Sequence, residues 1–484
     1  MNQVINITPE IQSGEPVFSG TRVPIKNLFD YLNGGDSIDE FLDDFPSVRR
    51  EQVIELLNGT GEAEILKHDL NQYFSELLKF ESTPEMEASE LYRKIKPEVD
   101  RILNAVVVTE PSASAGGQNA WEPGFAVSDD AFDNGAVAAS GNWPPANAGG
   151  SDFVSVLAWN IERGNRFEGI VDALQNHPKL KQKDLLLLTE LDYGMARSGN
   201  RFVAKEIADA LQLNYAFAPV YIALQKGSGV EEFAAGENTN SIHGLAMLSR
   251  FPMRNVHTVP LPNGKDKMWG KEKRLGHLRA LIADIEHPTG MFRAVTIHLD
   301  AHCSRAHRHK QMKIILDHLE TLDSLPTLIG GDWNTTTFNS QNATRAILGY
   351  WRRVMMGVKN VVKNHYPHPD RYFEKRLFGE IENRGFEYKP FNEIGAGTIH
   401  YHVESIEKNT NLRDWVPEWC MPFIFWAANR VGGTVSGRLD WFAGRSIELA
   451  TETQPKTIGG LKDDEGIPLS DHDAITLEFN LAHK

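Results

Sequence analysis

The strongest constraint on the fold is a series of short apolar stretches that begins at Val154 and continues almost to the end of the chain. Each stretch is bounded by polar or turn-forming residues, which is typical of β-strands. The stretches are FVSVLAWN, KDLLLLTE, GLAMLSRF, RALIADIE, MFRAVTIHL, PTLIGGD, GRLDWFAG and DAITLEF. Two segments between them, RFVAKEIADALQL and HRHKQMKIILDHLETL, have helical spacing. So many strands with few helices predict an α/β fold of two packed sheets with helices outside, not a doubly wound parallel sheet.

Several of these stretches begin or end with side chains that can bind a metal ion or a phosphate. The residues are Asn160 and Glu162, Glu190, His298 and Asp300, Asp332 and Asn334, Asp440, and Asp471 with His472. Burying so many carboxylates together is costly without a cation. A divalent ion with oxygen ligands removes that cost. The pattern therefore predicts a metal site that handles phosphate, with Mg²⁺ as the expected ion and Mn²⁺ as the alternative.

The stretch LIGGDWNTTTF allows two interpretations. Asp332 and Asn334 are two residues apart, so on an extended strand both side chains point to the same side. Taken alone, they are well explained as a turn cap, because Asp and Asn bond readily to their own backbone. The other polar strand ends favour the alternative, in which both residues belong to the site.

The motifs that carry these residues also indicate a family. WNIE, TELD, GLAMLSR, IHLD, GGDWNT, RLDWF and SDH occur in this order. Residues 153–480 thereby resemble the endonuclease/exonuclease/phosphatase superfamily, which includes DNase I-like nucleases, abasic-site endonucleases, inositol-phosphate 5-phosphatases and neutral sphingomyelinases. The resemblance implies a four-layer α/β/β/α sandwich with the active site where the two sheets meet.

The resemblance also implies a role for each strand-end side chain. It places the metal at Glu190, helped by Asn160, Glu162 and Asp471. Asp332 would orient or deprotonate the attacking water, and Asn334 would hold a phosphate oxygen. His472 would face the phosphate while Asp440 fixes its tautomer. His298 would donate a hydrogen bond to the phosphate or act as the general acid. Such a set supplies charge neutralisation, an aligned water and a proton donor, which phosphoryl hydrolysis requires.

Two further residues are candidates for substrate binding. Arg279 begins a strand and would either reach a phosphate oxygen or form a surface ion pair. His243, just before the glycine of GLAMLSR, would line the site.

Composition divides the chain into four parts. Residues 1–60 form a small helical module, residues 61–108 a helical extension, residues 109–151 a flexible Gly/Ala/Ser-rich linker, and residues 152–484 the catalytic domain, with an insertion at about 338–435. Because of the linker, residues 152–484 are expected to fold and remain active without residues 1–110.

The N-terminal module resembles a small domain of unknown function related to VapB-type antitoxins. The matching residues are Gly14, Pro16 and Val17, the stretch GTRVP at 20–24, Gly35 and Pro46. The resemblance implies a helix–turn–helix unit that binds DNA or pairs with a toxin. Residues 1–70 hold 5 Lys and Arg against 13 Asp and Glu, which favours a protein partner over DNA.

Charge and cysteine content limit the cellular context. The net charge of −15 lies entirely in residues 1–150, whereas residues 151–484 hold 40 basic and 40 acidic residues. The sequence contains two cysteines and shows neither a signal peptide nor an apolar run long enough for a transmembrane segment. The expected location is the cytoplasm.

The insertion contains two unusual stretches, HYPHPDRYFEKRLFGEIENRGFEYKPF and WVPEWCMPFIFWAANRVGG. Their aromatic residues would stack on nucleobases, contact lipid, or simply form core. The leading functional prediction is a nuclease that cleaves phosphodiester bonds with an activated water. One alternative is a phosphatase or phospholipase acting on inositol-phosphate or lipid phosphoesters. Another is a toxin–antitoxin or defence-type interaction protein that uses the N-terminal module.

Overall fold

The computed structural model describes most of the chain beyond residue 65. The described residues are 66–111, 136–141, 153–269, 271–335, 343–402 and 421–482, with 5–6, 17–24, 27–28, 31, 38–50 and 52–53 in the N-terminal module.

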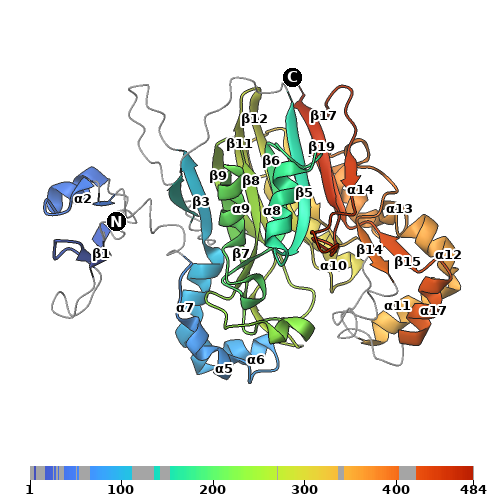
Figure 1. The fold of residues 1–484 in the computed structure, drawn as a ribbon, viewed down its shortest axis with the longest axis horizontal. Helices are drawn as coiled ribbons and strands as arrows, with labels where there is room; N and C mark the ends of the chain where they lie inside the picture. Colours follow the sequence, from blue (N-terminus) through green and yellow to red (C-terminus); the bar gives the residue numbers. More distant parts are fainter. Residues whose placement is uncertain are drawn as a thin grey trace.

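Two β-sheets form the centre of the molecule (Figure 1). The spatial order of the first is β17 (Ile447–Leu449), β19 (Ala474–Leu481), β5 (Val154–Arg163), β6 (Leu185–Tyr193), β8 (Ile242–Ser249), β7 (Asn214–Ala223), β3 (Val106–Pro111) and β4 (Ala136–Gly141), with β18 (Lys456–Ile458) beside β19 and β10 (Arg274–Gly276) beside β7. The order of the second is β16 (Asp440–Arg445), β13 (Thr327–Asp332), β12 (Gly290–His298), β11 (Arg279–His287) and β9 (Met253–Pro260).

The continuous apolar runs are explained by burial of both faces of a strand. In β6, Leu185 and Leu187 pack into the core shared with the second sheet. Leu186 and Leu188 pack into a separate core beneath the outer helices. Because successive side chains of a strand point to opposite faces, a strand covered on both sides needs apolar residues at every position.

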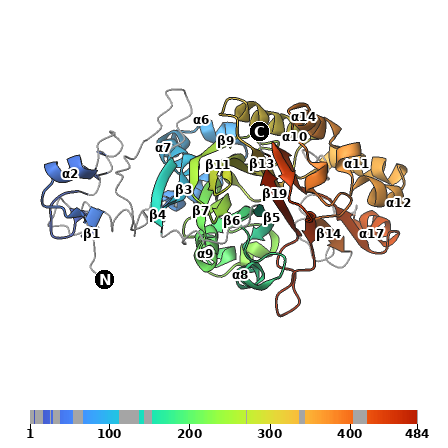
Figure 2. The ribbon, with the colours of Figure 1, turned by 90° about the horizontal axis from the view of Figure 1, so that it is seen from above.

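Helices cover the outer faces of both sheets. Figure 2 shows α8 (Phe167–Asn176) and α9 (Val203–Leu211) outside the first sheet, and α10 (Arg305–Leu319) and α14 (Lys375–Asn383) outside the second. The predicted α/β/β/α arrangement is confirmed. The remaining short helices of this part are η3 (Ala196–Ser198) and η4 (Gly229–Phe233).

The predicted helical extension belongs to the same core as the catalytic part. It comprises η2 (Leu70–Tyr73), α5 (Phe74–Leu77), α6 (Thr83–Ala88) and α7 (Glu90–Asn104). Ile95 and Ile102 of α7 share a core cluster with Phe217 of β7, and Val107 of β3 pairs with Phe217 in the sheet. Strands β3 and β4 therefore lie partly or wholly within residues 109–151, where composition predicted a linker. Residues 66–108 therefore contribute to this core, and the four-part division and the activity of residues 152–484 alone stay predictions.

The insertion is also partly core. Phe378 of α14, Tyr388 and Phe391 are buried in the main core, so this aromatic stretch is structural. Its other elements are α11 (Ala343–Met355), α12 (Val358–Asn360), a π-helical turn η5 (Val361–His365), α13 (Pro369–Tyr372), η6 (Lys389–Phe391), β14 (Ile399–His402), α17 (Met421–Asn429) and β15 (Thr434–Gly437). Residues 403–420 lie outside the described residues, and they include the first six residues of the tryptophan-rich stretch.

The N-terminal module has a small core of its own. Strand β1 (Ile5–Asn6) pairs with β2 (Val17–Phe18), and Phe18 packs against Phe41 of α2 (Ile38–Asp44). In the parts of the chain that the structure describes, no helix is both long and apolar enough to cross a membrane.

Candidate active site

The polar strand ends meet at one edge of the two sheets. In the second sheet, His298 lies beside Asp332, and Asp332 lies beside Asp440, on three neighbouring strands. In the first sheet, Asn160 and Glu190 come from the neighbouring strands β5 and β6. The strand order thus brings together residues that are up to 280 positions apart in the sequence.

Three of these positions have an unusual backbone. Glu162, Glu190 and Asn334 have φ values of 45°, 57° and 52°, in the left-handed region that non-glycine residues rarely adopt. The ladder registers shift at the first two of these positions. Such bulges re-aim side chains and cost free energy, and they are common next to active sites.

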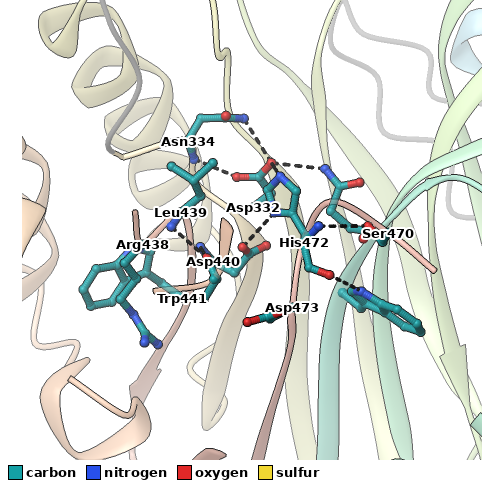
Figure 3. A network of polar contacts seen from close by, with 12 residues as sticks. Asp332, Asn334, Arg438, Leu439, Asp440, Trp441, Ser470, His472 and Asp473 are labelled. Atoms are coloured by element: carbon teal, nitrogen blue, oxygen red, sulfur yellow. Dashed lines mark hydrogen bonds and ion pairs between the residues drawn. The ribbon is translucent and has the colours of Figure 1, made fainter. Parts of the chain in front are cut away.

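Asp332 lies at the centre of the site and is almost fully buried (Figure 3). Its Oδ1 accepts the backbone N–H of Asn334 at 2.9 Å. Its Oδ2 accepts from the amides of Asn160 and Asn334, both at 3.2 Å. The Nε2 atoms of His298 and His472 lie 3.5 and 3.8 Å from the same oxygen. The carboxylate is therefore both a turn cap and the hub of the cluster, which joins the two interpretations of LIGGDWNTTTF.

The two asparagines hold carboxylates in this structure. Asn334 Nδ2 donates to the Leu299 carbonyl at 2.8 Å as well as to Asp332. Asn160 Nδ2 bridges Glu190 Oε1, at 3.1 Å, and Asp332. Asn160 Oδ1 accepts the backbone N–H of Glu162. Both amides therefore position the acidic groups, and this contact differs from the phosphate and metal contacts that the sequence predicted for them.

His472 and Asp440 form a buried pair. His472 Nδ1 lies 2.9 Å from Asp440 Oδ2. Burial lowers the pKa of His472, but the carboxylates of Asp440, Asp332 and Asp471 outweigh that effect and raise it well above its usual value. The imidazole is therefore charged at neutral pH, with Nε2 directed to Asp332, as Figure 3 shows.

Sequence reasoning missed the residues that support this pair. Ser470 Oγ accepts the His472 backbone N–H at 3.1 Å and donates to the Asn160 carbonyl at 2.6 Å. Thr398 Oγ1 accepts the backbone N–H of Asp440 at 3.1 Å. Ser470 is the first residue of the SDH motif, so its place in the site could have been predicted from the sequence. Thr398 lies in the insertion, outside any recognisable motif.

Glu190, Glu162 and Asp471 form an acidic group at the first sheet. Burial raises the pKa of Glu162 to about 8, together with the negative charges of Asp471 and Glu190. Burial also opposes ionisation of Glu190, but Arg163, His298 and other neighbours hold its pKa below its usual range. Crowded carboxyl oxygens fit the ligand chemistry of Mg²⁺ or Mn²⁺.

A second group of potential ligands lies beside the first. Donor atoms of Asp332, Asp440 and His472 all lie within 4.8 Å of one another. The Asp440 Oδ1 atom is buried and receives no hydrogen bond from the described residues. His472 supplies a positive charge to this group, as Arg163 does to the acidic group around Glu190.

His243 and Arg279 do not join the Asp332 cluster through any contact among the described residues. His243 Nδ1 lies 2.8 Å from Asp192 Oδ1, and Asp192 also binds Arg197 through two hydrogen bonds. Arg279 is buried and donates to Thr258 at 3.2 Å and to Asn104 of α7 at 3.0 Å. The surface ion pair considered for Arg279 is wrong, because its guanidinium is packed under the helical extension.

Comparison with protein families agrees with this geometry. The endonuclease/exonuclease/phosphatase family model matches residues 157–472, and the chain belongs to that family. A second model, described as a protein of unknown function (DUF433), matches residues 5–58. No curated protein matches the sequence.

Solved structures with similarity to the chain carry related descriptions. An endonuclease/exonuclease/phosphatase from Beutenbergia cavernae DSM 12333 is 16% identical, with 68% of this chain and 72% of that chain covered and a TM-score of 0.40. D. rerio TDP2 complexed with single strand DNA product is 14% identical, with 68% and 100% covered and a TM-score of 0.39. The human Nocturnin catalytic domain with bound sulfate is 13% identical, with 68% and 95% covered and a TM-score of 0.37.

Proposed function

We propose that this protein is a nuclease that hydrolyses phosphodiester bonds with a divalent cation, Mg²⁺ or alternatively Mn²⁺. Membership of the family supports phosphoester hydrolysis in general. The observation that carries the proposal is the buried Asp332 carboxylate, which lies between two histidines and two amides at the meeting point of both sheets. A carboxylate held in this way is suited to align and deprotonate a water.

The histidines have complementary roles in this proposal. His472 is kept cationic by Asp440 and neighbouring carboxylates and faces the phosphate as a fixed positive charge. His298 Nε2 lies 3.9 Å from Glu190 and 3.5 Å from Asp332, and it is available to donate a proton or a hydrogen bond. Asn334 keeps Asp332 in position through its backbone N–H and its amide.

The acidic group at the first sheet would hold the metal. Glu190 and Asp471 would be ligands, with Glu162 and Asn160 contributing after local rearrangement of their hydrogen bonds. A bound divalent cation would neutralise charge on the phosphoryl oxygens and lower the pKa of a bound water.

A lipid or inositol phosphoester is the second candidate substrate. Its support is a group of exposed apolar side chains on α11 and α17, comprising Leu348, Trp351, Met355, Phe423 and Trp426. Such side chains are suited to contact a lipid surface. A nucleic acid is favoured because the lysine-rich loop between β9 and β10 is bound to Asp300, two residues after His298.

The proposed location is the cytoplasm, which the low cysteine content supports. For the N-terminal module we propose a protein partner, supported by its excess of acidic residues. Nucleic-acid binding by this module is disfavoured for the same reason.

A substrate panel tests the function. The full chain is incubated with plasmid DNA, RNA oligomers, inositol phosphates and phospholipid vesicles, each with Mg²⁺ and with EDTA. We expect Mg²⁺-dependent cleavage of a nucleic acid that EDTA abolishes. Cleavage of lipid or inositol phosphate alone would replace the nuclease with the second candidate, and EDTA-resistant cleavage would remove the metal from the proposal.

Two variants separate the residue roles on whichever substrate is cleaved. Asp332→Asn should lower kcat by about 10²–10⁴-fold, because the group that activates water is lost. Glu190→Gln should also raise the Mg²⁺ concentration that gives half-maximal activity. If Asp332→Asn keeps full activity but melts well below the unaltered protein, Asp332 is only a turn cap.

A further inference from the structure

The loop that joins β9 to β10 is unusually basic for this part of the chain. The structure describes residues 261–269 and 271–273 of it. It contains Lys265, Lys267, Lys271 and Lys273, whereas residues 151–484 as a whole have equal numbers of acidic and basic residues. The loop also carries Trp269, which is 55% exposed.

One side of the loop is fixed to the active site. Asp300 follows His298 by two residues, and its Oδ2 accepts the backbone N–H of Gly264 at 2.6 Å. The same oxygen lies 3.8 Å from Lys267 Nζ. The carbonyl of Pro262 is bound by two side chains of α10 at 2.8 Å each. The loop is therefore anchored to the segment that carries one of the site histidines.

The other side is fixed to the helical extension. The Asp266 carboxylate accepts the backbone N–H of Thr83, the first residue of α6, at 2.8 Å. Lys273 Nζ donates to the carbonyls of Leu78 and Phe80 at 2.7 and 2.6 Å. The described parts of the loop are thus held by the fold before any ligand binds, which lowers the entropic cost of binding. This gives the extension a positioning role for a surface next to the site.

The side chains between these anchors suit a single-stranded nucleic acid. Lys265 Nζ lies 4.7 Å from the centroid of the Trp269 ring, and Lys271 is exposed. Exposed aromatic rings stack on bases of any sequence, and neighbouring lysines attract the phosphates between them. A phospholipid or an inositol phosphate has no base that would use the indole in this way.

We infer that this loop binds the single strand adjacent to the cleaved phosphate, with Trp269 stacked on a base and Lys265 and Lys271 close to backbone phosphates. The inference rests on the proposed nuclease function. It adds to the nuclease function a preference for unpaired nucleic acid, and it names the loop between β9 and β10 as the surface responsible for that preference.

Binding by the Trp269→Ala variant tests the stacking contact. With Asp332→Asn as a shared background to prevent cleavage, the Kd for a single-stranded oligonucleotide should rise by about 5- to 150-fold, the range for loss of one aromatic stack. Trp269→Phe should recover most of the affinity. An oligonucleotide of equal length with abasic sites should show little difference between Trp and Ala. The matched control is Met291→Ala, which removes a 40% exposed apolar side chain at the opposite end of β12 and should leave Kd unchanged.

Salt dependence tests the lysines. Lys265→Gln and Lys271→Gln should each reduce the slope of log Kd against log salt concentration by about 0.7, as expected for one phosphate contact on a single strand. Lys181→Gln, an exposed lysine in the loop before β6, is the control and should keep the slope.

The outcomes separate this inference from the nuclease proposal. If the unaltered protein cleaves nucleic acid but Trp269→Ala binds as tightly as the protein with Trp269, the loop inference is wrong and the nuclease stands. Equal losses on the normal and the abasic oligonucleotide would also overturn stacking. If the unaltered protein cleaves no nucleic acid in the substrate panel, both proposals fail together.

Discussion

Two histidines at the same edge of the molecule make nearly the same contact with a carboxylate, yet their pKa values are shifted in opposite directions. His472 Nδ1 lies 2.9 Å from Asp440, and His243 Nδ1 lies 2.8 Å from Asp192. Both side chains are buried, and burial lowers both pKa values. The net pKa of His472 is nevertheless raised, whereas that of His243 stays lowered.

The difference comes from what else surrounds each carboxylate. Asp192 accepts two hydrogen bonds from Arg197, at 2.8 and 3.0 Å, and the positive charge of Arg197 opposes a proton on His243. Around His472, Asp332 adds negative charge instead. A His–Asp pair therefore does not define a catalytic group by itself. The second neighbour of the carboxylate decides whether the imidazole carries a charge.

Replacing the two histidines gives the largest expected contrast. His472→Gln should lower kcat by about 10²–10⁴-fold, because the fixed cation that faces the phosphate is lost. His243→Gln should lower kcat by less than about tenfold, since its imidazole is neutral and is bound to Asp192. Steady-state kinetics on the substrate found in the panel measure both values. Equal losses in the two variants would remove the distinction between the pairs.

Replacing the two carboxylates should separate activity from stability. Asp440→Asn should reduce activity by about 10–100-fold, as is typical for a residue that supports a catalytic group. Asp192→Asn leaves the buried Arg197 without its closest counter-charge and should lower the free energy of unfolding by about 3 kcal/mol. Urea titration and kcat are measured on both variants. A larger stability loss for Asp440→Asn than for Asp192→Asn would reverse the assignment.

The sequence predicts the chemical groups of the candidate site better than the residues that hold these groups in position. Glu190 and Asp332 were recognisable because apolar strands end at them, and His472 because one begins after it; parallel and antiparallel pairing places such strand termini together. Arg197 and Thr398 were not recognisable, because a lone polar residue in a loop shows no partner until the chain has folded. Arg197 is 5 residues from its partner Asp192, and Thr398 is 42 residues from its partner Asp440.

The fold shows the same limit at its N-terminal edge. The apolar residues Val106 to Val108 stand directly before a long Gly/Ala/Ser-rich segment. Because of that composition, the sequence did not predict the strand of the first sheet that they form. Arg279 shows the same effect of long-range packing. It begins a strand as predicted, but α7 folds back over it and supplies Asn104 as its partner, 175 residues away. Long-range packing of this kind leaves no local pattern.

The smallest expected effect is the pH dependence of stability caused by His243. The pKa of His243 is lowered by burial and by Arg197, so below its unfolded pKa of about 6.5 the unfolded chain binds a proton that the folded chain does not. The unfolded state therefore gains from acidification, and His243 costs stability as the pH falls through that value. Between pH 7 and pH 5, the unaltered protein should therefore lose more stability than His243→Gln. Urea titrations at both pH values measure this difference, with His177→Gln, a half-buried histidine after α8, as the control. If His243→Gln and the unaltered protein respond equally to acid, folding does not lower the pKa of His243, and this part of the contrast with His472 is lost.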